Sequence, residues 1–206
     1  MKKTLSLLLA LCMMLSCVLL LSACDEKDDG GKGNDGGGGD EQTYTRAQLM
    51  DFSYLAPDGW EKADYSGNDM VDYTRTSGMN FDMLFLSTAE PETGLESKPV
   101  LDEWDGEDPA AAFREQLEAQ LGADAVKAVE VLSISDSDVA IYCQISVSGI
   151  TQHQYTYIKY ATLAVENGDS VTYACWRIHM QYATTGGRND KVFGELKAGI
   201  VLNPQN

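Results

Sequence analysis

The chain has 206 residues, of which 15 are Lys or Arg and 32 are Asp or Glu, so its formal net charge is −17. A negative charge of this size repels phosphate backbones, and the sequence therefore predicts no nucleic-acid partner. Hydrophobic residues make up 44% of the chain. This length and composition favour one acidic globular domain with appendages over a multidomain protein.

The first 23 residues have the organisation of a secretory signal. Lys2 and Lys3 precede an apolar run over residues 5–21, and the segment ends in Leu21-Ser22-Ala23-Cys24. This order is typical of a cleaved signal peptide rather than a membrane span. The last four residues resemble a bacterial lipobox, which implies cleavage after Ala23 and lipidation of Cys24. The alternative is an ordinary cleaved signal in which Cys24 is incidental.

Lipidation at Cys24 would determine where the mature protein lies. Burial of each acyl methylene contributes about 0.8 kcal/mol, and two chains give stable anchoring. Loss of Lys2 and Lys3 with the signal would leave 13 basic side chains against the same 32 acids, a charge of about −19. We expect an extracytoplasmic protein whose membrane partner is reached through Cys24, on the outer face of the bacterial cytoplasmic membrane.

Residues 24–42 are predicted to be the lipidated cysteine and a disordered tether. Positions 25–41 contain seven acids, seven glycines and no hydrophobic residue. Such a segment cannot bury enough surface to offset the entropy lost on ordering. Its acids also lack the spacing of an EF-hand loop, so no calcium site is predicted. Residues 43–206 are predicted to form a single domain.

The first half of this domain is predicted to contain strands and one helix. Turn residues and alternating apolar positions predict strands at 52–56, 70–75 and 80–87. The stretch 88–107 is acidic and contains two prolines, which favours a surface loop. A helix is predicted from Asp108-Pro109, an N-cap followed by a first-turn proline, to a stop at Gly122.

The second half is predicted to be an antiparallel meander closed by a helix. Strands are predicted at 129–134, 139–147, 153–165 and 170–182, and the helix at 190–200. The turn Asn167-Gly168 predicts a two-residue hairpin loop that places Tyr155 opposite Met180. For the preceding hairpin a three-residue loop, Ser148-Gly149-Ile150, is preferred, because a two-residue loop would mix apolar and polar side chains on both faces.

These registers predict one apolar sheet face and one polar, aromatic face. The apolar face would hold Ile141 and Cys143 beside Tyr155 and Tyr157. Tyr and Arg are enriched at binding hot spots, so the polar face is the candidate binding surface. The candidate residues on it are Tyr142, Thr156, Tyr160, Arg177 and His179. The alternative is that the closing helix covers this face, since that helix needs a partner surface for its own apolar side.

The sequence predicts no catalytic, metal or cofactor site. Cys143 and Cys175 are predicted to point to opposite faces and to remain free thiols, because a disulfide needs converging side chains. Cys175 and His179 lie four residues apart on one strand, roughly 13 Å, which is too far for a nucleophile and its base. Neither His falls in a metal-binding spacing.

The element order predicts an α+β fold, in which a mostly antiparallel sheet of about six to seven strands packs with two helices. A strand entering a Pro-x-Gly-Trp turn (52–60), a central helix, a long meander and a closing helix with Phe193, Leu196 and Ile200 resemble the PsbP-type α/β/α sandwich. That fold occurs in a photosystem extrinsic protein, a small Ran-binding protein and many bacterial lipoproteins. The resemblance implies binding or assembly and brings no catalytic motif.

The expected function is therefore a non-catalytic binding or assembly module with a protein or glycan partner in the cell envelope. The alternative is an envelope hydrolase that uses acidic residues of the 92–108 loop, among them Asp102 and Glu103. A ligand receptor with two hinged lobes is disfavoured, because residues 43–206 have no two-lobed pattern.

Overall fold

The computed structural model describes residues 42–64, 66–101, 108–168 and 170–203. The predicted signal and most of the predicted tether, residues 1–41, lie outside these ranges. The elements are β1 (Tyr44–Leu49), β2 (Phe52–Pro57), β3 (Glu61–Lys62), β4 (Met70–Ser77), β5 (Asn80–Thr88), β6 (Glu92–Leu95), α2 (Pro109–Leu121), β7 (Val126–Ile134), β8 (Asp138–Val147), β9 (Ile150–Asn167), β10 (Ser170–Thr184), α3 (Asp190–Ala198) and β11 (Val201–Leu202).

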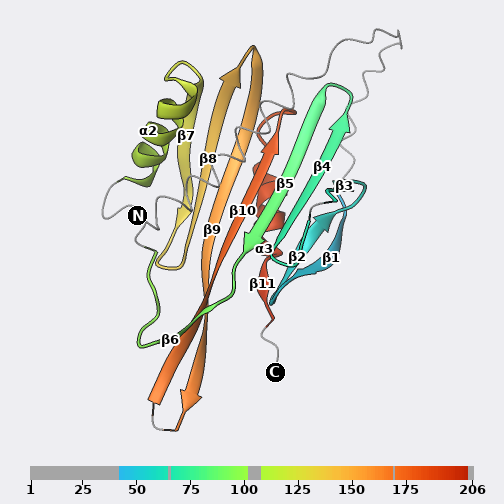
Figure 1. The fold of residues 1–206 in the computed structure, drawn as a ribbon. Coiled ribbons are helices and arrows are strands. Elements are labelled where there is room, and N and C mark those ends of the chain that lie inside the picture. Colours follow the sequence, from blue (N-terminus) through green and yellow to red (C-terminus); the bar gives the residue numbers. More distant parts are fainter. Residues whose placement is uncertain (1–41, 65, 102–107, 169, 204–206) are drawn as a thin grey trace. The chain divides into compact units, whose positions relative to one another are not determined.

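The strands form two antiparallel sheets. The larger has eight strands, with seven in the order β3-β4-β5-β10-β9-β8-β7 and β6 paired to β10, and the smaller has the order β1-β2-β11. The predicted α+β class with two helices is confirmed. The strand number exceeds the prediction, because β1, β3, β6 and β11 were not among the predicted strands. Of these, β6 lies in the stretch predicted to be a loop, and β11 directly follows the predicted last helix. Figure 1 shows α2 beside β7 at one edge of the large sheet and α3 behind β5 and β10.

Both helices begin and end where their local sequence directs. Asp108 caps α2 by accepting a 3.0 Å hydrogen bond from the Ala110 amide, and Gly122 follows the helix with φ of 87°, a conformation that favours glycine. Asn189 caps α3 by accepting from the Val192 amide at 3.2 Å. Among the described residues, neither helix has the length and apolar character needed to cross a membrane.

The β8–β9 register differs from the prediction by one residue. The loop contains only Ser148 and Gly149, which have φ of 53° and 82°, and Val147 pairs with Ile150. Positive φ at both central residues is the requirement of a tight type I′ turn. A one-residue shift moves every side chain to the other face. Ile141 and Cys143 therefore lie on the face opposite to Tyr155 and Tyr157, and the predicted face assignment is wrong here.

The β9–β10 register differs by two residues. Asn167 pairs with Ser170, so the turn begins at Gly168, with φ of 63°, and Tyr155 lies opposite Tyr182 rather than Met180. Because side chains alternate with a period of two, a two-residue shift leaves the faces of β9 and β10 as predicted. Only the partners along each row change.

We name the two faces of the large sheet the Tyr155 face and the Thr156 face, after neighbouring residues of β9. The Tyr155 face packs against α3 and β2 through Phe193, Leu196 and Phe52 in one buried cluster. The Thr156 face is also buried, with Ile141 and Cys143 each 1% exposed. Both faces therefore contain apolar core side chains, in place of the predicted division into one apolar and one polar face.

Candidate functional site

The observed registers separate the five predicted site residues. Thr156, Tyr160, Arg177 and His179 lie on the Thr156 face, and Tyr142 lies on the Tyr155 face. The predicted row of Tyr142, Thr156 and His179 does not form. Tyr142 is instead in line with Tyr155 and Tyr182, whose rings follow one another at centroid distances of 5.2 and 5.5 Å.

The residues on the Thr156 face differ in accessibility. Thr156 and His179 are buried, while Tyr160 and Arg177 lie opposite each other and are half-buried. Burial, helped by the positive charge of Arg177, lowers the pKa of His179 to about 4, so its imidazole is neutral near pH 7. Its ring meets Phe85 edge-on at 6.3 Å. His179 is thus a buried neutral side chain rather than an accessible base.

The closing helix covers the Tyr155 face. Phe193 of α3 stacks on Tyr155 with ring centroids 4.7 Å apart. The Tyr155 hydroxyl accepts a 2.7 Å hydrogen bond from the Asn189 amide and donates to Asp190 Oδ1 at 2.8 Å. These two bonds fix the first residues of α3 over the sheet, next to Tyr142.

A charged and aromatic cluster forms where α3 begins, and we name it the Arg188 cluster. It consists of Glu130, Tyr142, His153, Arg188 and Asp190. The guanidinium lies 4.2 Å above the Tyr142 ring centroid. Its Nη1 donates to Glu130 Oε2 at 2.8 Å, and its Nε donates to both Asp190 oxygens at 2.9 and 3.0 Å. The hydrogen bonds from Arg188 lower the pKa of Asp190.

His153 completes this cluster through Tyr142. Its Nδ1 and the Tyr142 hydroxyl share a hydrogen bond of 2.8 Å, and the two rings stack at 6.0 Å. Partial burial and the nearby Arg188 charge lower the pKa of His153, which favours the neutral imidazole. The Arg188 side chain is 38% exposed, so the cluster presents an oriented guanidinium on aromatic rings to solvent.

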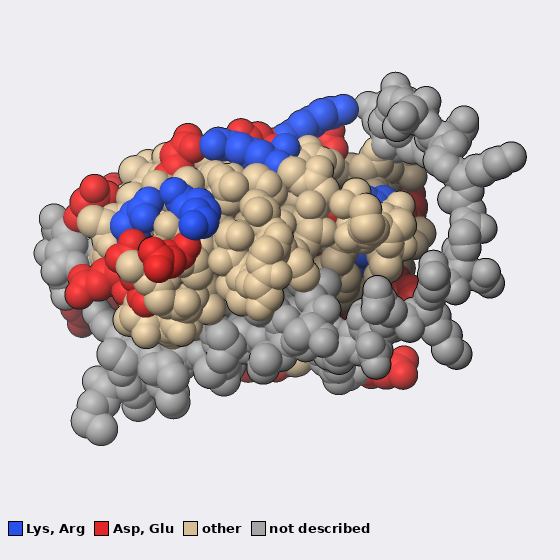
Figure 2. Space-filling model, turned by 90° about the horizontal axis from the view of Figure 1, so that it is seen from above, with Lys and Arg blue, Asp and Glu red and all other residues tan. Residues whose placement is uncertain are grey.

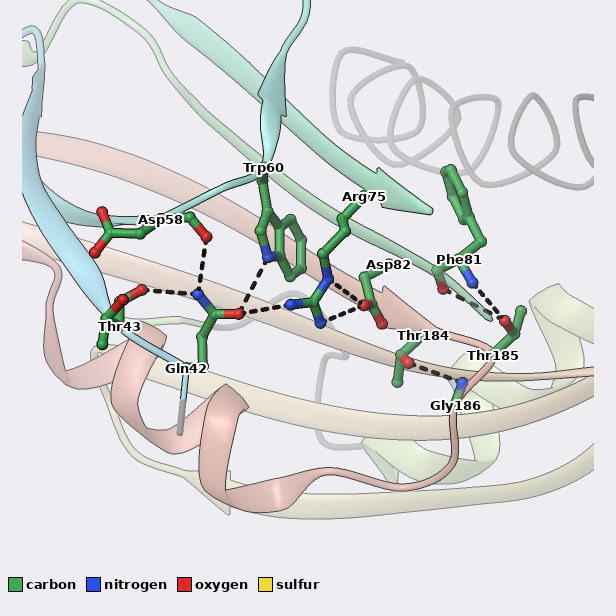
Figure 3. A network of polar contacts seen from close by, with 10 residues as sticks. All are labelled: Gln42, Thr43, Asp58, Trp60, Arg75, Phe81, Asp82, Thr184, Thr185 and Gly186. Carbon is green, nitrogen blue, oxygen red and sulfur yellow. Dashed lines mark hydrogen bonds and ion pairs between the residues drawn. The ribbon is translucent and has the colours of Figure 1, made fainter. Parts of the chain in front are cut away.

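A second arginine has the same kind of environment on β4. Arg75 donates from Nε and Nη2 to Asp82 Oδ2 at 3.0 and 2.6 Å, and it lies 5.0 Å over the Trp60 ring (Figure 3). Gln42 Oε1 accepts from both Arg75 Nη1 and Trp60 Nε1 (Figure 3). Asp82 is buried, so this ion pair compensates a carboxylate inside the fold.

One cross-strand row connects the two arginine sites. Its members, from β8 to β4, are Gln144, His153, Thr184, Asp82 and Arg75. The row lies on the Tyr155 face, next to the aromatic row of Tyr142, Tyr155 and Tyr182. In the view of Figure 2, Lys and Arg lie beside Asp and Glu around a wide uncharged area. Ion pairs join Arg75 to Asp82, Arg114 to Glu118, Lys191 to Glu195, and Arg188 to both Glu130 and Asp190.

The potential nucleophiles are in their unreactive forms. Burial raises the pKa of the Cys143 thiol to about 12, and burial together with the Glu92 carboxylate raises that of Cys175. Thiolates are the reactive species, so both cysteines are poor nucleophiles at neutral pH. Cys175 and His179 lie on the same face of β10 but four residues apart, roughly 13 Å, which excludes a direct dyad.

Both cysteines are free, as predicted, but for a different reason. They lie on the same face, not on opposite faces. Cys143 is next to Gln154 and Cys175 is next to Thr162, eight residues further along β9, so their separation is roughly 27 Å. This distance greatly exceeds the Cα separation that a disulfide allows.

Neither thiol should react with a maleimide in the folded protein. We expect no labelling of Cys143 or Cys175 over minutes at pH 7, because both are buried and protonated. Both should be labelled completely in denaturant. Peptide mass spectrometry would identify the modified residue, and rapid native labelling of Cys143 would contradict its position in the core.

The acidic loop of the hydrolase alternative is only partly described. Asp102, Glu103, Asp105 and Glu107 fall in residues 102–107, outside the described residues. Asp108 is described and caps α2, and Glu92 lies in β6 opposite Cys175. Glu92 and Asp108 therefore have identified structural positions, and no three His, Cys, Asp or Glu side chains in the described ranges converge as metal ligands would.

Sequence reasoning did not find Glu130, His153, Arg188 or Asp190 as site residues. His153 meets Tyr142 only when β8 and β9 have the two-residue loop, whereas Glu130 lies opposite Tyr142 in the β7–β8 pairing. Arg188 and Asp190 reach them from the start of α3. The local signal available was Arg188-Asn189-Asp190, an N-cap flanked by opposite charges at a helix start. That signal predicts the start of the helix but not the sheet residues on which the helix packs.

No protein-family model and no curated protein matches this chain. Among solved structures it is similar to LpqN of Mycobacterium tuberculosis, which is described as involved in cell envelope biogenesis. The two chains are 12% identical, the match covers 81% of this chain and 84% of that one, and the TM-score is 0.31. A TM-score this low carries no argument, so the function proposed below rests on this chain's own residues.

Proposed function

We propose that this protein is a membrane-anchored extracytoplasmic lipoprotein that acts as a non-catalytic binding or assembly module. The lipobox-like Leu21-Ser22-Ala23-Cys24 supports the anchor and the location. The order of strands and helices, with α3 closing one sheet face, supports a PsbP-like sandwich. The partner would be a protein or glycan of the cell envelope.

The observation that carries the binding half of the proposal is the Arg188 cluster. Arg and Tyr are the residues most enriched at interface hot spots. Two carboxylates and the Tyr142 ring fix the guanidinium, so a partner would not have to order a flexible side chain on binding. The lowered pKa of His153 keeps the adjacent imidazole neutral, and its Nδ1 is already hydrogen-bonded to Tyr142. This arrangement suits recognition better than proton transfer.

The proposal predicts that Arg188→Gln reduces partner capture from bacterial membrane extracts by about tenfold, the effect of losing one hot-spot residue. Arg114→Gln is the matched control. Arg114 is also 38% exposed and paired with an acid, Glu118, but it lies on α2 away from the cluster. Quantitative mass spectrometry of proteins captured by each variant would measure the ratio, with melting temperatures compared first. Equal capture by both variants would remove the cluster from the binding surface.

The candidate residues of the Thr156 face are tested separately. We propose that Tyr160 and Arg177, which lie opposite each other, form a second contact area, with Thr156 and His179 further along the same face. A Tyr160→Ala/Arg177→Ala double variant in the same capture experiment distinguishes the two faces. Loss of the partner in this variant alone would assign binding to the Thr156 face instead of the Arg188 cluster.

A further inference from the structure

The hairpin of β9 and β10 extends past the strand that pairs with β9. The last β8–β9 pair is Asp138 with Lys159, and the Tyr160 amide still donates to the Ser137 carbonyl at 2.7 Å. The hairpin continues to Asn167 and Ser170, so it projects beyond the other strands (Figure 1). On its other side β6 pairs with β10, at Tyr173 and Cys175. Within the described part of the chain, residues 161–167 of β9 therefore form a sheet edge without a neighbouring strand.

This edge lacks the features that normally prevent pairing with another chain. Its sequence is Ala161-Thr162-Leu163-Ala164-Val165-Glu166-Asn167, without Lys, Arg or Pro, and with Glu166 as its one charge. Leu163 and Val165 are 37% and 38% exposed. Proteins usually protect edges with charges, prolines or bulges, since an exposed edge is a template for strand addition. The β9–β10 register across this stretch has no bulge.

We propose that this edge is a homodimer interface in which β9 of one copy pairs antiparallel with β9 of a second copy, centred on Ala164. In this register Leu163 lies opposite Val165 of the partner subunit, and the reverse pair is identical by two-fold symmetry. Two leucines and two valines then meet on one face. Glu166 lies opposite Thr162 of the partner subunit, so no like charges are opposed.

The low charge of this edge permits the approach of a second copy. The chain carries a formal net charge of −17, so most contacts between copies would bring acids together. The segment 161–167 is one where two copies can approach with a single acid each, and those two acids are offset from one another along the strands. Ala164 at the centre also leaves room for the two backbones to approach. The inference is independent of the proposed function.

The test is cysteine cross-linking in the full chain expressed in bacteria. Ala164→Cys should give a disulfide-linked dimer on non-reducing gels, because residue 164 faces its own copy within the Cα range of a disulfide. Glu166→Cys is the matched control. It lies on the same side of the strand, but in this register the two copies of residue 166 are separated by four positions, roughly 13 Å. We expect no dimer band for this control, nor for the parent chain.

Charge variants added to Ala164→Cys test the register and the identity of the partner. Leu163→Lys/Val165→Lys places Lys opposite Lys twice and should lower the cross-linked fraction by about tenfold. Leu163→Lys/Val165→Glu places Lys opposite Glu of the partner subunit and should retain it. All replaced side chains are exposed, so folding is preserved. Three results would overturn the proposal. The first is equal cross-linking at residues 164 and 166, and the second is an equal loss of cross-linking in both charge variants. The third is cross-linking of Ala164→Cys to another protein instead of to a second copy.

Discussion

Replacing Cys24 with alanine should move the protein from the membrane fraction to the soluble fraction. In the proposed maturation Cys24 carries the acyl chains, and each buried methylene contributes about 0.8 kcal/mol, so their loss removes essentially all anchoring. The mature chain would have a charge of about −19 and should not be held by anionic lipids. Cell fractionation with immunoblotting, supported by metabolic labelling with palmitate, measures the change.

Cys17→Ala is the control for this experiment. Cys17 follows Met14-Leu15-Ser16, a poorer lipobox, so this variant should stay in the membrane fraction and keep its palmitate label. A Cys24→Ala protein that kept its palmitate label would contradict lipidation at Cys24. A protein that lost both properties through Cys17→Ala would place the lipidated residue at Cys17.

The second large effect is expected from Phe193→Ala, which should lower the free energy of unfolding by about 3–5 kcal/mol, the usual cost of removing a buried aromatic side chain. Phe193 is 4% exposed and stacks on Tyr155, and it joins α3 to the large sheet. Without it, the hydrogen bonds from the start of α3 to Tyr155 lose their packing support. Urea denaturation followed by tryptophan fluorescence measures the change.

Gly194→Ala is the control within the same helix. Gly194 is exposed, and an added Cβ would meet no heavy atom within 4 Å. Alanine favours helix over glycine, so this variant should be more stable by up to about 1 kcal/mol. If Phe193→Ala and Gly194→Ala both left stability unchanged, α3 would not be part of the cooperative fold.

The local features of this protein could be predicted from the sequence. Asp108-Pro109 and Gly122 gave the bounds of α2, because capping and helix termination depend on residues within one turn. Strict alternation from Val139 to Val147 identified β8, since a strand shows its period along its own length. The α+β class followed from the order of such elements.

The small sheet and the partners of the Arg188 cluster could not be predicted. β11 is two residues long and pairs with β2, more than 140 positions earlier in the chain, so neither strand signals the other. Arg188 meets Glu130 and Tyr142 through α3 docking on the sheet. Contacts of this kind depend on where whole elements pack, which no local pattern encodes.

The sequence by itself determined both helices, the long strands of the large sheet and the chemistry of the amino-terminal segment that predicts an anchor at Cys24. Only the tertiary structure decided which residues share a face, because one residue in the Ser148-Gly149 turn reverses the orientation of the strand. The prediction assumed that one face must be polar. Because both faces are buried, the pattern of apolar and polar residues does not set the register of β8 and β9, and the positive φ angles of the turn set it instead. This register places Tyr142, rather than Thr156 or His179, beneath Arg188.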